Sequence, residues 1–192
     1  AANGRLLVEK VQKKQRKRNP TAPFTTSTLQ QEAARKLGFT TQRTMRTAQQ
    51  LYEGIDTGGG ATGLITYMRT DSVQLSDEAV TELREFIVER YGEGNLPASP
   101  QQAIRTTSVR RTPDELKDHL TKDQFRLYEL VWKRTLACQM VHATINTVTA
   151  DLSCGAGNMF RANGSTIANP GFMAVYLEDV DDAKKGKDDE KM

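Results

Sequence analysis

The spacing of apolar residues changes twice along this chain. Residues 5–11 alternate and then become apolar, which predicts a strand, whereas between residues 27 and 141 the apolar positions recur every three or four residues, as in amphipathic helices. Alternation with a period of two then returns and predicts strands over residues 144–152, 159–162 and 172–176. Strands at both ends with helices between them predict an α+β fold in which a mainly helical domain is inserted into a β-rich domain.

Capping signals divide the middle of the chain into helices. Ser27 or Thr28 can cap a first helix that ends at Gly38, and Thr41 starts a second. The buried stripe of the second helix is predicted to be Met45, Ala48, Leu51, Tyr52 and Ile55. Two short helices in this order have the form of a helix-turn-helix, a shape that suits DNA but is too common to identify a function. Further helices are predicted to start at Ser76, at Thr112 and at Thr121.

Charge is distributed unevenly, although the net charge of the 192 residues is only +3. Residues 1–18 carry seven Lys or Arg side chains against the single Glu9, and we expect a polar, basic loop between the first strand and Pro20. Such a run is either a solvated surface or a contact for phosphate groups, and both interpretations stay open. Residues 178–192 interleave acidic residues with lysine, hold few apolar ones, and are predicted to be disordered.

Several classes of protein are not indicated by the sequence. No stretch approaches the roughly 20 apolar residues needed to cross a bilayer, and the first residues lack an apolar signal core, so we expect a cytoplasmic protein with no membrane partner. Cys138, Cys154, His119 and His142 stand without further ligands at metal-binding spacing, which predicts no metal site in this chain. The glycine-rich stretch 56–63 lacks the Lys-Ser/Thr ending of a nucleotide-binding loop.

Residues 64–68 form an apolar run that predicts a short strand and contains Tyr67. Tyr67 and Arg69 are two residues apart, so both project from the same face of a strand. A phenol with a pKa of about 10 is a poor nucleophile at neutral pH, and Arg69 can supply the nearby positive charge that it needs. The guanidinium can also bind a phosphate oxygen, and Asp71 can orient it or cap the turn. Spacing alone, however, leaves Tyr67 and Arg69 an ordinary pair on a strand.

The ten residues from Gly63 to Ser72, Gly-Leu-Ile-Thr-Tyr-Met-Arg-Thr-Asp-Ser, resemble the active-site signature of bacterial type IA DNA topoisomerases. A run of this length is too specific to arise from composition. The resemblance extends over most of the chain, through Trp132 and residues 23–31, 34–39, 44–45, 48–52, 75–76, 127–128 and 137–140.

The resemblance implies an isomerase that relaxes negative supercoils without ATP. Tyr67 would attack one strand of single-stranded DNA and form a transient ester with its 5′ phosphate, which Arg69 would stabilise, while a second strand passes through the gap. Asp71 and Arg105 are implied as support for the site. Four further arginines, each also interpretable as an ordinary surface residue, are predicted phosphate contacts: Arg43, Arg46, Arg110 and Arg111.

The family is a torus in which the tyrosine lies on a largely helical, winged-helix-like domain inserted into a β-rich arch. By this resemblance residues 1–23 are a strand and loop of the arch, residues 24–141 the tyrosine domain, and residues 142–177 the returning strands. The acidic domain that binds Mg²⁺ in the family is missing, so we expect a fragment that holds no cofactor and does not relax DNA alone. Its partners would be DNA, chiefly single-stranded, and the missing domains of the same enzyme.

One motif departs from the family pattern. The family has His-Glu-Ala-Ile-Arg-Pro near the tyrosine, whereas this chain has Gln101-Gln-Ala-Ile-Arg-Thr106, which retains Arg105 but lacks the histidine, glutamate and proline. Two alternatives stay open. A non-catalytic winged-helix module built on residues 28–55 would prefer a specific duplex, whereas the topoisomerase piece would bind single strands through salt-sensitive phosphate contacts. A purely structural interaction domain would bind no DNA.

Overall fold

The computed structural model describes residues 6–71, 75–97, 105–154 and 157–177, which form two compact units. The sheet unit takes in the described parts of residues 1–19 and 142–171, and the helical unit takes in those of residues 20–141 and 172–178. The prediction of a fold that mixes helices and strands is therefore confirmed. Within the described residues, no helix combines the length and the apolar character needed to cross a membrane.

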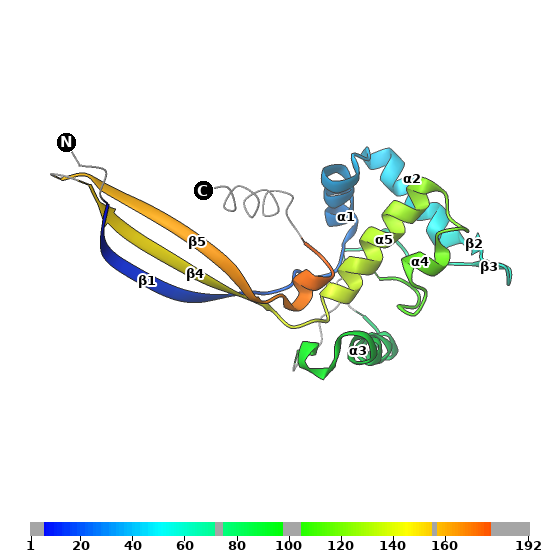
Figure 1. Ribbon diagram of the computed structural model, residues 1–192. Coiled ribbons are helices and arrows are strands. Elements are labelled where there is room, and N and C mark those ends of the chain that lie inside the picture. Colours follow the sequence, from blue (N-terminus) through cyan, green and yellow to red (C-terminus); the bar gives the residue numbers. More distant parts are fainter. Residues whose placement is uncertain (1–5, 72–74, 98–104, 155–156, 178–192) are drawn as a thin grey trace. The chain divides into compact units, whose positions relative to one another are not determined.

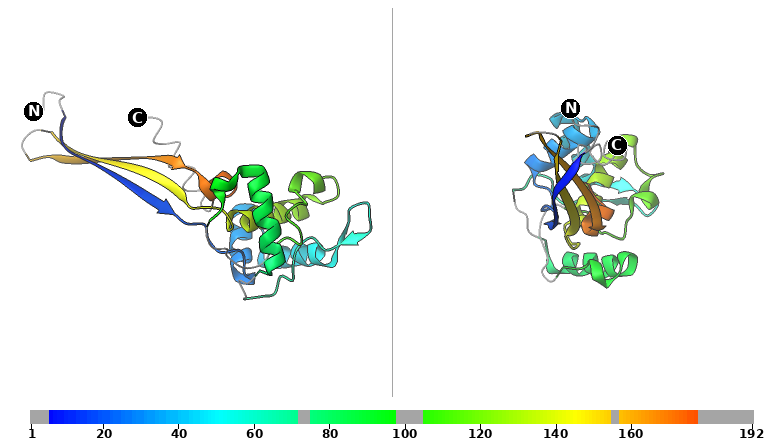
Figure 2. Two further views of the ribbon diagram at one scale, coloured as in Figure 1. Left: turned by 90° about the horizontal axis from the view of Figure 1, so that it is seen from below. Right: turned by 60° about the vertical axis from the view of Figure 1, so that its left-hand side comes forward.

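The sheet unit is built on three antiparallel strands in the order β1-β4-β5 (Figure 1). The strands are β1 (Leu7–Arg18), β4 (Ala143–Ser153) and β5 (Met159–Asn169). Figure 2 shows the three strands twisting about one another, as strands of L-amino acids do. The two later strands confirm the period-two prediction, and β5 runs seven residues further than its predicted end at residue 162.

The first strand overturns one prediction. β1 continues to Arg18 through the stretch expected to be a basic loop, and it pairs with β4 as far as Arg18 opposite Ala143. Lysine and arginine have modest strand propensity, but the paired backbone of β4 decides the structure here. Their long side chains reach solvent from either face, so the strand tolerates them. The strand ends just before Pro20, which lacks the N–H that a ladder needs.

The described part of the helical unit contains five α-helices, whose starts follow the capping signals. Four starts were predicted correctly, because helices begin at Thr41 and directly after Ser76, Thr112 and Thr121. The first helix is instead capped by Thr25, in a capping box with Thr28. The helices are α1 (Thr26–Glu32), which continues as a π-helical turn (Ala33–Leu37), α2 (Thr41–Glu53), α3 (Asp77–Tyr91), α4 (Pro113–Leu116) and α5 (Lys122–Ala137).

Helix α5 supplies much of the core of this unit. Its residues Leu127, Val131 and Leu136 are fully buried, and α2 packs against it with Ala48 and Leu51. The predicted stripe of α2 was only partly right, because the inward positions beside Ala48 and Leu51 are threonines, while Met45 and Ile55 are half-buried and Tyr52 is exposed. The threonines fit the core because a buried hydroxyl can be satisfied locally: Thr44 Oγ1 donates to the Thr40 carbonyl at 3.0 Å.

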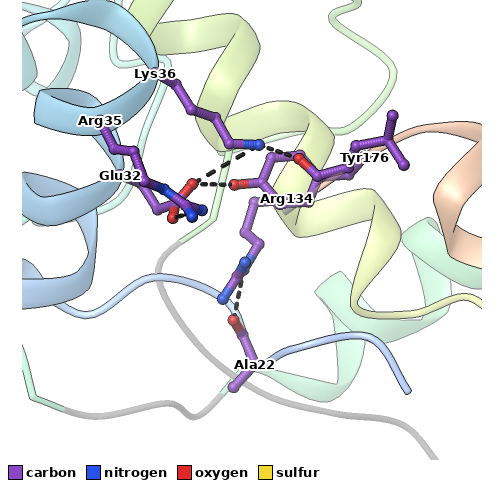
Figure 3. A network of polar contacts seen from close by, with 7 residues as sticks. Ala22, Glu32, Arg35, Lys36, Arg134 and Tyr176 are labelled. Atoms are coloured by element: carbon purple, nitrogen blue, oxygen red, sulfur yellow. Dashed lines mark hydrogen bonds and ion pairs between the residues drawn. The ribbon is translucent and has the colours of Figure 1, made fainter. Parts of the chain in front are cut away.

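The chain returns to the helical unit after the sheet. Residues 172–176 were expected to form a strand, but Gly171–Ala174 is a short 3₁₀ helix. Phe172 and Tyr176 are four residues apart and both buried, so helical spacing rather than alternation matches their packing. In Figure 3 the Tyr176 hydroxyl donates to the Glu32 carboxylate at 2.9 Å, and the Arg134 side chain donates to the Ala22 carbonyl at 2.7 Å. The Tyr176 bond ties the returning segment to α1, and the Arg134 guanidinium, which lies 5.4 Å from the centre of the Tyr176 ring, ties it to α5.

Cys138 caps the C-terminal end of α5 in the core, and it gives the unit a pH-dependent stability. Burial raises the pKa of its thiol from 9.0 to about 12. This contribution is therefore fully present below pH 9, where the unfolded thiol is still protonated, and is lost as the pH rises toward 12. One proton changes the free energy of unfolding by about 1.4 kcal/mol per pH unit over this range.

We predict that Cys138→Val removes this part of the pH dependence. Urea unfolding of the wild-type chain and the variant at several pH values between 8 and 11 should show their stability difference changing, above pH 9, by about 1.4 kcal/mol per pH unit in favour of the variant. Tyr128 and Tyr176, whose pKa values are also raised by burial, are present in both proteins and cancel in the comparison. A difference that stays constant across this range would contradict the assignment.

Candidate active site

Tyr67 lies in an extended segment, residues 63–70, of the helical unit. Leu64 and Met68 are fully buried, whereas Tyr67 is 51% exposed and Arg69 is exposed as well. The buried Met68 lies between them in sequence, so Tyr67 and Arg69 both point away from the core toward solvent. The strand predicted here is reduced to a single antiparallel bridge between Ile65 and Thr106.

Residues 105–107 hold one edge of this segment. The Thr66 N–H donates to the Arg105 carbonyl at 3.0 Å, and the Thr107 N–H donates to the Leu64 carbonyl at 3.0 Å. The Arg105 guanidinium is turned to the backbone and donates to the carbonyls of Thr106 (3.1 Å) and Thr107 (3.3 Å). The Arg105 side chain is therefore bonded to the backbone next to the Tyr67 segment.

Helices α1 and α2 make further hydrogen bonds to the Tyr67 segment. The Leu64 N–H donates to the Leu51 carbonyl in the last turn of α2 at 2.8 Å. Beyond Tyr67, the Thr26 hydroxyl donates to the Met68 carbonyl at 2.7 Å and accepts from the Thr70 N–H at 2.9 Å. Thr26 is the first residue of α1, so the backbone on either side of Tyr67 is tied to two different helices.

Tyr52 is a neighbour of Tyr67 that sequence reasoning missed. The two rings make an edge-to-face contact with centroids 5.4 Å apart, and Tyr52 is itself 41% exposed. A hairpin, β2 (Ile55–Asp56) and β3 (Ala61–Thr62), reverses the chain after α2 and brings Gly63 back beside Tyr52. A Cβ at Gly63 would lie 2.7 Å from the Tyr52 carbonyl oxygen, so only glycine permits this close approach.

The polar groups of Tyr67, Arg69 and Asp71 are available to a ligand. All three residues are exposed, and within the described parts of the chain no hydrogen bond or ion pair engages their side chains. An exposed phenol two residues from an exposed guanidinium can meet one phosphate group, with the guanidinium neutralising charge on its oxygens. The arrangement is therefore suited to attack on a phosphodiester.

Two of the arginines predicted to contact DNA already have carboxylate partners. Arg43 makes two bonds of 2.7 Å to Asp123, and Arg110 makes two bonds of 2.9 Å to Glu89. The hydrogen bonds from these arginines hold the pKa values of Asp123 and Glu89 below their usual range. Both pairs lie at the surface, where such contacts contribute little to stability. To bind a phosphate, each arginine would have to exchange a partner.

The other two predicted DNA contacts have different surroundings. Arg111 donates to the Thr107 hydroxyl at 3.1 Å and so lies beside residues 105–107, which bond to the Tyr67 segment. Arg46 is exposed on α2 and lines a pocket of about 630 Å³. The pocket lies between α2 and the start of α5 and is lined by Arg43, Arg46, Thr47, Gln50, Thr121, Lys122, Asp123 and Gln124.

The described residues do not offer a site for the expected Mg²⁺. They contain no group of three or more His, Cys, Asp or Glu side chains placed to hold a metal ion. Gln101 and Gln102, where the sequence departs from the family motif, and the tail at 178–192 lie outside the described residues. Thr106, which stands where the family has proline, is buried, and its hydroxyl has no hydrogen-bond partner in the described chain.

Comparisons with known proteins agree with one another. A family model described as DNA topoisomerase matches residues 1–192. DNA topoisomerase 1 of Xylella fastidiosa is 50% identical over 204 residues, covering 99% of this chain and 25% of the relative, and that of Rickettsia felis is 51% identical over 189 residues, covering 91% and 24%. Full-length topoisomerase I from Thermotoga maritima matches with a TM-score of 0.81 and 43% identity, over 91% of this chain and 30% of that one. The chain thus spans about a quarter of the length of these curated relatives.

We predict that Gly63→Ala destabilises the helical unit by about 1–3 kcal/mol, because the new methyl group overlaps the Tyr52 carbonyl oxygen. Gly59→Ala is the matched control, since a Cβ there meets nothing within 4 Å. Urea unfolding measures both variants. Equal stabilities would show that the backbone near Tyr67 can move aside, and that the close approach does not hold the site.

Proposed function

This chain belongs to the bacterial type IA DNA topoisomerase family, and we propose that it is the strand-cleaving part of such an enzyme. Tyr67 is the nucleophile. Its phenol oxygen attacks a phosphodiester of one DNA strand, forms an ester with the 5′ phosphate, and releases the 3′ oxygen, which takes up a proton. Attack by that 3′ hydroxyl on the ester reseals the strand and frees Tyr67. Passage of a second strand between the two steps relaxes negative supercoils without ATP.

The exposed pair of Tyr67 and Arg69 on a tightly held segment is the observation that supports this proposal. Attack requires the phenol to lose its proton and the phosphate to accept more negative charge. The positive charge of the Arg69 guanidinium favours both changes. Because the backbone is fixed on either side of Tyr67, the phenol has fewer orientations available before attack. This lowers the entropic part of the activation free energy of cleavage.

The finer architecture is also part of the proposal. We assign residues 24–141 to a winged-helix-like tyrosine domain and residues 1–23 and 142–177 to a β-rich arch, with residues 172–177 folded onto the helical unit. The chain would act in the cytoplasm on single-stranded DNA, together with further domains of its enzyme. Mg²⁺ would be held by one of those domains, and no step above is assigned to it.

A non-catalytic winged-helix module has less support. Such a module would use exposed cations on the α1–α2 pair to hold duplex DNA. The Arg43 side chain on α2, however, already makes two hydrogen bonds to Asp123. It also gives no reason for Tyr67 and Arg69 to be exposed together. The exposed catalytic pair therefore favours the cleavage proposal.

We predict that Tyr67→Phe abolishes a covalent protein–DNA adduct. The parent full-length enzyme would be incubated with Mg²⁺ and a single-stranded oligonucleotide labelled at its 3′ end, and the products separated on a denaturing gel. A labelled protein band in the wild type that the variant lacks identifies Tyr67 and a 5′ linkage. Tyr52→Phe is the control, because it removes the phenol hydroxyl from the neighbouring ring and should leave the band. A band that persists in Tyr67→Phe would place the nucleophile elsewhere.

We predict that Arg69→Gln slows cleavage by about 10²–10³-fold, since it removes a charge that stabilises the transition state. Single-turnover cleavage at saturating oligonucleotide separates this effect from binding. Arg46→Gln should behave in the opposite way, with weaker binding and an unchanged cleavage rate, because Arg46 is exposed on α2 rather than in the Tyr67 segment. Equal cleavage rates in Arg69→Gln and the wild type would remove Arg69 from the mechanism.

A further inference from the structure

Strand β1 carries a concentration of positive charge that the proposed cleavage reaction does not use. Six of its twelve residues are Lys or Arg, and Glu9 is its one acidic residue. Glu9 accepts a bond from Ser153, and Asp151, the one acidic residue of the two neighbouring strands, is bound to Arg161 at 2.6 Å. These acidic residues lie toward one end of the sheet, so none lies beside residues 13–17.

The strand register places these cations on two different faces. Lys14 is paired with Thr147, and Thr147 with Ser165, so their side chains share what we call the hydroxyl face. Around Lys14 and Arg16 its members are Gln12, Thr147, Thr149, Asn163 and Ser165, with Ile145 opposite Arg16 and Ile167 opposite Ile145. Lys13 and Lys17 project from the opposite side, which we call the valine face. It carries Val8, Val11, Val148 and Phe160, and toward Lys17 it also carries Gln15, Thr144, Asn146 and Thr166.

We propose that the hydroxyl face is a second DNA-binding surface, which holds the phosphate backbone of duplex DNA in a unit that does not contain Tyr67. Phosphate contacts in proteins come from Lys and Arg together with Ser, Thr, Asn and Gln, and two neighbouring rows of this face, Gln12–Thr149–Asn163 and Lys14–Thr147–Ser165, are built from these types alone. Lys14 and Arg16 are exposed and, being two residues apart on a strand, lie about 7 Å apart along it. The surface rests on the proposed function, since it serves an enzyme that acts on DNA.

The composition of the face favours duplex over single-stranded DNA. Surfaces that bind single strands combine positive charge with aromatic rings on which the bases stack. The hydroxyl face has no aromatic member, and Phe160 lies on the opposite face. A face without a stacking platform depends on its contacts with the backbone, and duplex DNA presents the higher density of backbone charge.

Another role for the lysines competes with this one. β1 is an edge strand of the sheet, and lysine on an edge strand discourages pairing with the edges of other molecules. Protection of this kind depends on charge along the edge and is indifferent to the face from which each side chain projects. The arrangement of the cations on two faces therefore allows the two roles to be separated by experiment.

The test compares two pairs of substitutions in this chain, Lys14→Gln with Arg16→Gln and Lys13→Gln with Lys17→Gln. Both pairs remove the same charge from the same strand, but from opposite faces. Binding to labelled duplex and single-stranded oligonucleotides of equal length would be followed by fluorescence anisotropy over a range of salt concentrations. Melting temperatures and light scattering of each variant would be measured alongside, so that unfolding or self-association is seen.

We expect the hydroxyl-face pair to weaken duplex binding about tenfold at 0.1 M salt and to lower the slope of log affinity against log salt by about 1.8, the value for two lost phosphate contacts. The valine-face pair should lower this slope by less than half as much. Equal losses from both pairs would indicate net charge alone, and unchanged binding with increased self-association would indicate edge protection. Either result, or a larger loss with single strands than with the duplex, would overturn the proposal.

The outcome can be separated from that of the cleavage proposal. Tyr67→Phe should leave duplex binding by this chain unchanged, because Tyr67 is not part of the sheet unit. Conversely, the hydroxyl-face pair in the full-length enzyme should still form the covalent adduct with a saturating single-stranded oligonucleotide. Loss of that adduct in the hydroxyl-face pair would overturn the assignment of this face to a separate surface. Failure to detect an adduct in the wild type would bear on Tyr67 alone.

Discussion

The site depends on backbone hydrogen bonds that fix an almost unpaired segment inside the helical unit. Residues 63–70 belong to no extended strand, yet several of them are buried, and a buried N–H or carbonyl without a partner is costly. The partners come from Thr26, Leu51 and residues 105–107, which are far apart in sequence. Tyr67 is therefore placed by three separate parts of the chain, and its geometry exists only when the whole unit is folded.

Burial of the apolar side chains in this segment is what exposes the chemical ones. Leu64, Ile65 and Met68 are each at most 1% exposed, and burying one such side chain stabilises the fold by about 1.5–3 kcal/mol. Rotating the segment to bury Tyr67 or Arg69 would bring Met68 to the surface and a guanidinium toward the core. Exposing the apolar side chain and burying the charge would both destabilise the fold. The apolar residues of the ten-residue signature therefore orient Tyr67 and Arg69, the pair that we propose to be reactive.

The sequence predicted what depends on local rules and failed where distant partners decide. Thr112 and Thr121 marked helix starts correctly because a capping box is made by residues within one turn. Strand β1 could not be followed to Arg18, because its pairing with β4 joins residues more than a hundred positions apart. Tyr52 was misplaced for the same reason: its exposure beside Tyr67 follows from the hairpin that returns Gly63 to the end of α2. The segment that carries Tyr67 was recognisable from its sequence, but the contacts that hold it were not.

The same dependence on partners decides what each cation can do. From the sequence, Arg43 and Arg110 were as good candidates for phosphate contact as any basic residue. In the structure, however, Arg43 is bound to Asp123 and Arg110 to Glu89, and both carboxylates come from other elements of the chain. Lys14 and Arg16 looked like part of a solvated loop, yet pairing with β4 places Thr147 opposite Lys14 and Ile145 opposite Arg16, and neither partner is a carboxylate. A phosphate that binds Arg43 must displace a carboxylate, whereas one that binds Lys14 displaces only water. Among the described residues, a positive charge is therefore available to a phosphate where the fold leaves it without an acidic neighbour, which holds for Lys14 and Arg16 on the sheet as well as for Arg69 beside Tyr67.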